Sequence, residues 1–129
     1  MIVDARALVR GAIAGLAVIV PVSLAVEILE RNVDDLEGSG WMFIPFVAVL
    51  VAYVHAGRLA GAAAPDAPLS HGALAALIAF AGWLLVRVAV PLVQGDDLGF
   101  GPRAIVTNAM FAAAFGLLGG ALGTRNARV

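Results

Sequence analysis

The sequence predicts an all-α membrane protein: a four-transmembrane-helix bundle made of two parallel helical-hairpin repeats. Composition is the first reason, because 62% of the 129 residues are hydrophobic and only 13% are charged, whereas soluble domains average about 45–50% apolar and about 25% charged residues. A chain this short cannot bury the excess in one core. The other reasons are four apolar segments of bilayer length and a similarity between the two halves of the chain. We therefore expect residues 1–129 to form a single transmembrane domain.

Four segments are long and apolar enough to cross a bilayer, which takes about 20 residues in a helix. They are residues 8–29, 41–63, 72–93 and 104–124, each bounded by charged residues, Gly or Pro. None shows the short alternating pattern of a transmembrane β-strand. Because backbone polar groups in lipid need partners within their own segment, each segment is predicted to be a helix.

The first segment could also be read as a secretory signal, since Arg6 and Arg10 precede an apolar run. That run is about 19 residues long, which exceeds the 7–15 residues of a signal's apolar region. It ends in Glu27–Arg31 without a small-residue cleavage site. We therefore expect a retained first span.

The arginines predict the orientation, because the chain contains no Lys. Four crossings place both termini and the middle loop on one side. That side holds Arg6, Arg10, Arg58, Arg125 and Arg128, and the other side holds Arg31 and Arg103. The positive-inside rule then predicts a plasma-membrane protein with both termini in the cytoplasm. The outer side is predicted to be acidic.

The two halves of the chain, residues 8–63 and 70–124, share three features in the same order. Gly11–Leu16 aligns with Gly72–Leu77 at an offset of 61 residues. Asp34-Asp35-Leu36 aligns with Asp96-Asp97-Leu98 at an offset of 62 residues. The pair Gly57 and Gly61 aligns with Gly119 and Gly123, also at 62 residues. The pattern indicates an internal duplication of a two-helix hairpin. Two such hairpins enter the membrane in the same direction, so an approximate two-fold along the membrane normal is expected.

Small residues at helical spacing predict close helix packing. Gly57 and Gly61 form one such face in the second span. A longer face in the fourth span contains Gly116, Gly119, Gly120 and Gly123. Packing within the chain and a homo-oligomer seam are both consistent with these faces.

Arg87 is the charged residue that lies deepest in a predicted span, where a charge is costly and is generally paired or functional. The duplication places it within one residue of the position equivalent to Glu27. An Arg87–Glu27 ion pair at matched depth is therefore predicted. The alternatives are an arginine that extends its head to the outer interface, and an anion or proton site.

The duplicated acidic pairs form a candidate cation site on the outer side, made of Asp34, Asp35, Asp96 and Asp97. Hard cations bind clustered carboxylates, but Asp beside Gly in a short loop is also typical turn chemistry. His55 and His71 flank the middle loop, and no Cys, Asp or Glu completes a metal-binding spacing with them. Placement at the membrane interface explains both histidines.

Several function classes are excluded. A chain without Cys has no disulfide, thiolate metal site or catalytic thiol. It has no basic stripe for nucleic acid. No nucleophile–base arrangement, phosphate loop or haem or zinc motif is present, so neither enzymatic activity nor a cofactor is expected.

Two stretches, Ser70–Leu77 and Gly116–Arg125, resemble a class of small, mostly uncharacterised four-span membrane proteins of actinobacteria. The resemblance implies a four-helix inner-membrane protein and no established activity. The leading functional hypothesis is a non-enzymatic membrane protein acting by helix–helix interaction, as an accessory or assembly subunit or a homo-oligomer, with the lipid bilayer and other membrane proteins as its partners. The alternative is a small transporter or channel formed by an oligomer of the bundle.

Overall fold

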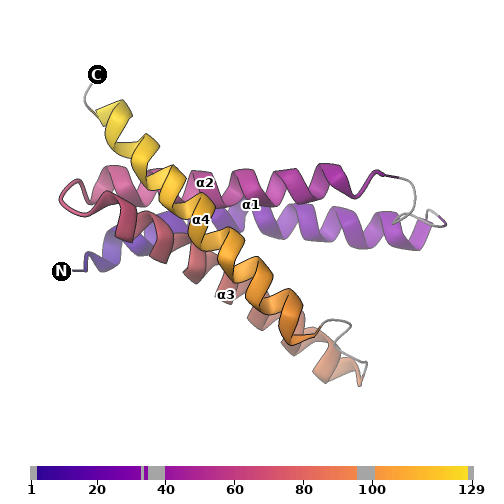
Figure 1. The fold of residues 1–129 in the computed structure, drawn as a ribbon. Helices are drawn as coiled ribbons and strands as arrows, with labels where there is room; N and C mark the ends of the chain where they lie inside the picture. Colours follow the sequence, from indigo (N-terminus) through magenta and orange to yellow (C-terminus); the bar gives the residue numbers. More distant parts are fainter. Residues whose placement is uncertain (1–2, 33, 35–39, 96–100, 128–129) are drawn as a thin grey trace.

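The computed structural model describes residues 3–32, 34, 40–95 and 101–127, and the regular structure among them is entirely helical (Figure 1). The four helices are α1 (Ala5–Asn32), α2 (Phe43–Ala63), α3 (Pro68–Gln94) and α4 (Pro102–Ala127). All four are long and apolar enough to cross a membrane. The predicted all-α architecture with four such helices is confirmed.

Helices α1, α3 and α4 extend beyond the predicted apolar segments, whereas α2 begins two residues later than predicted. Local capping, rather than hydropathy, sets the ends of α1 and α3. The Asp4 carboxylate accepts hydrogen bonds from the backbone N–H groups of Arg6 (3.0 Å) and Ala7 (3.3 Å), which caps the start of α1. Pro68 occupies the first turn of α3, where its missing N–H costs nothing. Gly95 ends α3 in the left-handed conformation (φ 78°) that favours glycine.

Figure 1 shows two antiparallel hairpins, α1–α2 and α3–α4, that cross and then diverge. We call the end where each hairpin joins its two helices the hairpin end, and the end that carries both termini and the α2–α3 connection the terminal end. The hairpin ends lie apart, at the right and lower right of Figure 1. The crossing lies nearer the terminal end.

The packing of the hairpins departs from a strict two-fold. Contacts join α2 to α4, α3 to α4, α1 to α2, α2 to α3 and α1 to α3. A two-fold that exchanged the hairpins would turn the α2–α3 contact into an equivalent α1–α4 contact. Within the described ranges the backbone of α2 lies close to that of α3, whereas the backbones of α1 and α4 do not approach each other closely. The short α2–α3 connection draws those two helices together and has no counterpart between α1 and α4.

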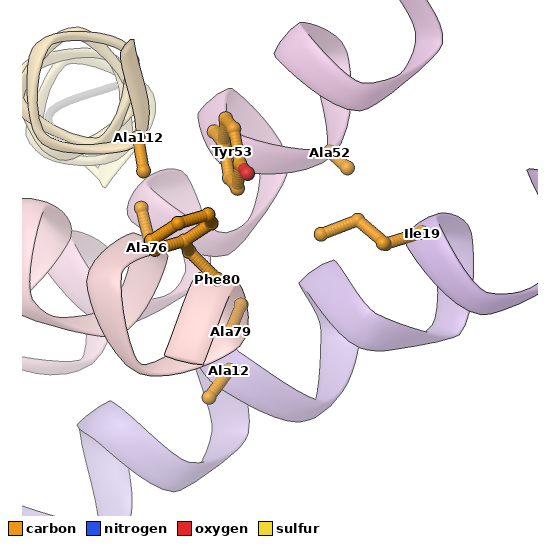
Figure 2. Packing of buried hydrophobic residues seen from close by; sticks show 8 residues of the cluster. All are labelled: Ala12, Ile19, Ala52, Tyr53, Ala76, Ala79, Phe80 and Ala112. Atoms are coloured by element: carbon orange, nitrogen blue, oxygen red, sulfur yellow. The ribbon is translucent and has the colours of Figure 1, made fainter. Parts of the chain in front are cut away.

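The core is built mainly from alanine. Figure 2 shows eight buried members of its main cluster, in which the rings of Tyr53 and Phe80 and the side chain of Ile19 lie among five alanines. Only 17–28% of the residues in each apolar window are buried. Most of the helix surface is therefore left for lipid, as expected for a small membrane bundle.

Candidate functional site

A cleft lies between the diverging hairpins on the hairpin side of the core. Its first part, the α1–α3 groove, has a volume of about 380 Å³ between α1 and α3. Its second part, the central pocket, has about 250 Å³ and is lined by residues of all four helices. Both parts share Ser23, Val26, Glu30, Trp83 and Arg87. Trp83 and Arg87 therefore separate two hollows of one cleft.

Trp83 joins the two hairpins at the apex of the cleft. Its Nε1–H donates a hydrogen bond of 2.7 Å to Oγ of Ser23, which links α3 to α1. The bond satisfies an indole donor that lipid cannot satisfy. The guanidinium carbon of Arg87, one turn further along α3, lies 5.2 Å from the Trp83 ring centroid, within the range of a cation–π interaction.

The structure brings the predicted partners Glu27 and Arg87 to the same place, since both line the α1–α3 groove. Glu27 also has a partner that the sequence analysis did not assign. Its Oε1 accepts a hydrogen bond of 2.7 Å from Nη2 of Arg31, one turn along the same helix. Glu30 lines the groove too, so two carboxylates and Arg87 meet near the hairpin end.

Tyr53 forms the floor of the central pocket. Its side chain is only 2% exposed, and it lies at the middle of α2. None of the described residues hydrogen-bonds to its hydroxyl, yet no described side-chain oxygen is both fully buried and without a partner. The hydroxyl therefore contributes to the small exposed remainder of the side chain, and that remainder faces the pocket.

Asn108 of α4 completes the polar lining of the central pocket. Its side-chain nitrogen donates a hydrogen bond of 2.8 Å to the carbonyl oxygen of Ala104, one turn back along α4. This bond uses a donor of the amide and leaves its oxygen as an acceptor.

The predicted glycine faces pack against each other inside the chain. A Cβ added to Gly57 would meet the carbonyl oxygen of Gly116, and one added to Gly61 would lie 2.7 Å from Cα of Gly120. Real side chains do not tolerate such distances from backbone atoms. The α2–α4 contact at the terminal end is therefore a direct backbone-to-backbone approach.

The remaining glycines of α4 extend this contact. A Cβ on Gly119 would lie 2.8 Å from the backbone nitrogen of Arg58, and one on Gly123 would lie 2.9 Å from that of Ala62. Gly72 of α3, which the sequence analysis did not single out for packing, would place a Cβ 2.8 Å from Cα of Gly120. Three helices thus meet without room for side chains.

The candidate outer cation site falls largely outside the described residues, which exclude Asp35, Asp96 and Asp97. Asp34 is exposed in a turn after α1. Among the residues that are described, no cluster of three His, Asp or Glu side chains could hold a metal ion. His71 is buried within the bundle, near the start of α3, and His55 is exposed.

Tyr53, Ser23 and Glu30 line the cleft and were not predicted from the sequence as site residues. A signal existed for Tyr53, because it is the only Tyr of the chain and lies at the centre of an apolar segment, where polar side chains are costly. No signal in the sequence pairs Ser23 with Trp83, since that contact depends on how the hairpins cross. Comparisons with known protein families, curated proteins and solved structures find no match to this chain.

Proposed function

We propose that this chain is a non-enzymatic plasma-membrane protein that binds a small molecule in an outward-facing cleft, as a binding or transport component. One observation carries the proposal: Glu27, Glu30 and Arg87 line a cleft toward the hairpin end of the bundle, while glycine contacts pack the terminal end closely. All three side chains are exposed on the walls of this cleft, and charged residues within membrane-spanning helices generally mark a ligand or ion path. A purely structural bundle has no need of this asymmetry.

The orientation proposed from the arginines makes the terminal end cytoplasmic and the hairpin end external. The cleft then opens to the outside. Arg87 is seven residues before the end of α3, which is about 10 Å at 1.5 Å per residue. Tyr53 lies at the middle of α2, so the cleft extends from the outer interface to about half the depth of the membrane.

Duplication of a hairpin remains our proposal for the origin of the bundle. The matches at offsets of 61 and 62 residues support it. The unequal α2–α3 and α1–α4 relationships are then a later departure from symmetry. That departure suits a cleft on one side, because a strict two-fold would repeat the cleft on both sides of the bundle.

Helix–helix interaction with a second membrane protein, or with another copy, is the second candidate function. Large apolar side chains at the diverging hairpin ends support it, including Val93 (88% exposed), Phe43 (68%) and Leu92 (66%). The glycine faces do not, because they are occupied within the chain. Light scattering on protein purified in mild detergent tests this candidate, and a single copy without a bound protein contradicts it.

Thiol labelling tests the outward-facing cleft, since the chain has no Cys and any introduced thiol is unique. Val86 lines the α1–α3 groove, whereas its neighbour Leu85 is 71% exposed outside it. In intact cells, a membrane-impermeant maleimide should label Val86→Cys and leave Leu85→Cys unmodified, because a thiol in lipid does not ionise. Asp66→Cys, in the α2–α3 connection, should react only after permeabilisation. Equal, low reactivity of Val86→Cys and Leu85→Cys contradicts the proposal.

A further inference from the structure

The central pocket has the features of a ligand site rather than a packing defect. Its floor carries the hydroxyl of Tyr53, a residue that is only 2% exposed. This hydroxyl has no hydrogen-bond partner among the residues described. No described side-chain oxygen is both fully buried and without a partner, so the hydroxyl keeps an accessible surface, and Tyr53 lines the central pocket. The hydroxyl is therefore available to a group that enters the pocket.

The walls of the pocket are apolar. They include Val22, Met42, Phe46, Val49 and Trp83. A volume of about 250 Å³ is below the roughly 300–1,000 Å³ of sites for drug-sized ligands. The occupant is therefore compact and mostly hydrophobic.

The charges of the pocket lie toward the hairpin end. Among its described lining residues, the charged ones are Glu30 and Arg87, which have opposite signs and lie nearer the ends of α1 and α3 than Tyr53 does to the ends of α2. The floor, at the level of Tyr53, is lined by neutral groups. A charged ligand at this depth would lose its hydration without gaining a counter-charge. The occupant is therefore neutral at the end that reaches Tyr53.

The floor offers a defined set of hydrogen-bonding groups. The Tyr53 hydroxyl both donates and accepts, and the Asn108 amide oxygen accepts while its nitrogen is bonded to Ala104. A hydroxyl on the ligand can accept a hydrogen bond from the Tyr53 hydroxyl and donate one to the Asn108 amide oxygen. A ligand carbonyl can accept from Tyr53 alone.

From these observations we infer that the central pocket binds a small, neutral amphiphile: a compact aromatic or branched apolar body with one hydroxyl or carbonyl oxygen that hydrogen-bonds to Tyr53. The inference deepens the proposed function and depends on it for the outward route of entry.

Binding of p-cresol and toluene tests the inference, because the two probes differ by one hydroxyl on the same apolar body. A Trp41→Phe background leaves Trp83, in the wall of the pocket, as the only Trp reporter, since the chain has two. Titration of the detergent-solubilised protein should give saturable changes in Trp83 fluorescence with p-cresol. Tyr53→Phe should weaken p-cresol binding by about three- to tenfold, the value of one net hydrogen bond, and leave toluene binding unchanged.

Tyr53→Phe keeps the ring and removes only a hydroxyl without a partner, so the variant should fold. Ser70→Ala is the matched control, because it removes a hydroxyl at the terminal end and should not change p-cresol binding. An equal effect of Tyr53→Phe on both probes, or no saturable binding of p-cresol, overturns the inference.

The outward-facing cleft and the ligand class can be tested independently. Labelling of Val86→Cys without a Tyr53-dependent preference for p-cresol over toluene overturns the ligand class and supports the outward-facing cleft. A Tyr53-dependent preference without labelling of Val86→Cys supports the ligand class and overturns entry from the outside.

Discussion

The backbone N–H of Asp4 donates a hydrogen bond of 2.9 Å to Nε2 of His71, a residue 67 positions away. The other ring nitrogen, Nδ1, lies 2.8 Å from the carbonyl oxygen of Ala67. Because Nε2 accepts this hydrogen bond, Nδ1 carries the ring hydrogen and donates a hydrogen bond to the Ala67 carbonyl oxygen. The imidazole is thus held in one neutral tautomer, and it ties the start of α1 to the start of α3.

Replacing His71 should therefore destabilise the terminal end of the bundle. His71→Leu removes both hydrogen bonds from a side chain that is 2% exposed and leaves the Asp4 N–H without its acceptor, at a cost of about 1–3 kcal/mol. Thermal unfolding in detergent measures the loss. His55→Leu is the matched control, because His55 is exposed and its replacement should change stability little. Equal effects of the two substitutions contradict the structural role of His71.

Loss of the Ser23–Trp83 hydrogen bond should be detectable as a change in Trp83 fluorescence. In the Trp41→Phe background, Ser23→Ala removes the acceptor of the Trp83 indole N–H, which is 2.7 Å away, whereas Ser23→Thr retains a hydroxyl. We expect Ser23→Ala to shift the Trp83 emission and to lower stability by about 1 kcal/mol. Ser23→Thr should preserve both properties. An unchanged spectrum in Ser23→Ala would show that α1 and α3 are not joined at this point.

The α2–α4 backbone contact should not tolerate a side chain. Gly61→Ala places a methyl group against Cα of Gly120, at a distance of 2.7 Å before relaxation, so the helices must separate. Overpacking of this kind costs about 1–3 kcal/mol. Gly101→Ala is the control, since nothing lies within 4 Å of its added Cβ. Thermal unfolding and the yield of folded protein should fall for Gly61→Ala alone; similar values for both variants would contradict the contact.

Double-mutant cycles can divide the interactions of Glu27 between its two candidate partners. The Glu27–Arg31 pair is exposed, with side chains 57% and 75% accessible, so its coupling should not exceed about 0.5 kcal/mol. Arg87 shares the α1–α3 groove with Glu27, and the proposed position of that groove within the membrane lowers the dielectric constant around the pair relative to bulk water. We expect a larger coupling for Glu27→Gln with Arg87→Met than for Glu27→Gln with Arg31→Met. A negligible Glu27–Arg87 coupling would refute the ion pair predicted from the sequence.

The four helices could be predicted because membrane partition is a local property. Each apolar segment carries its own hydropathy, and its helix satisfies its own backbone, so neither depends on which helices become neighbours. The ends of the helices were less predictable. The Asp4 cap and Pro68 place the starts of α1 and α3, and Gly95 places the end of α3, outside the apolar segments. Hydropathy does not indicate a helix boundary among such residues.

The candidate site could be predicted only in part. Arg87 and Glu27 were identifiable because charge in an apolar segment stands out, and they do share a groove. Tyr53, Ser23 and the Ser23–Trp83 bond belong to the site through the crossing of the hairpins. Residues separated by 60 positions meet there, and no periodicity in the sequence encodes that meeting.

The sequence by itself determined that this chain has four apolar helices with polar connections and glycine-rich faces. The tertiary structure alone decided that those glycines pack within the chain, and that the opposite end opens into a cleft with Tyr53 at its floor. The physical reason is that lipid solvates an apolar helix as well as another helix does. Neighbours are therefore chosen by the fit of backbones and a few hydrogen bonds between distant segments, not by hydrophobicity.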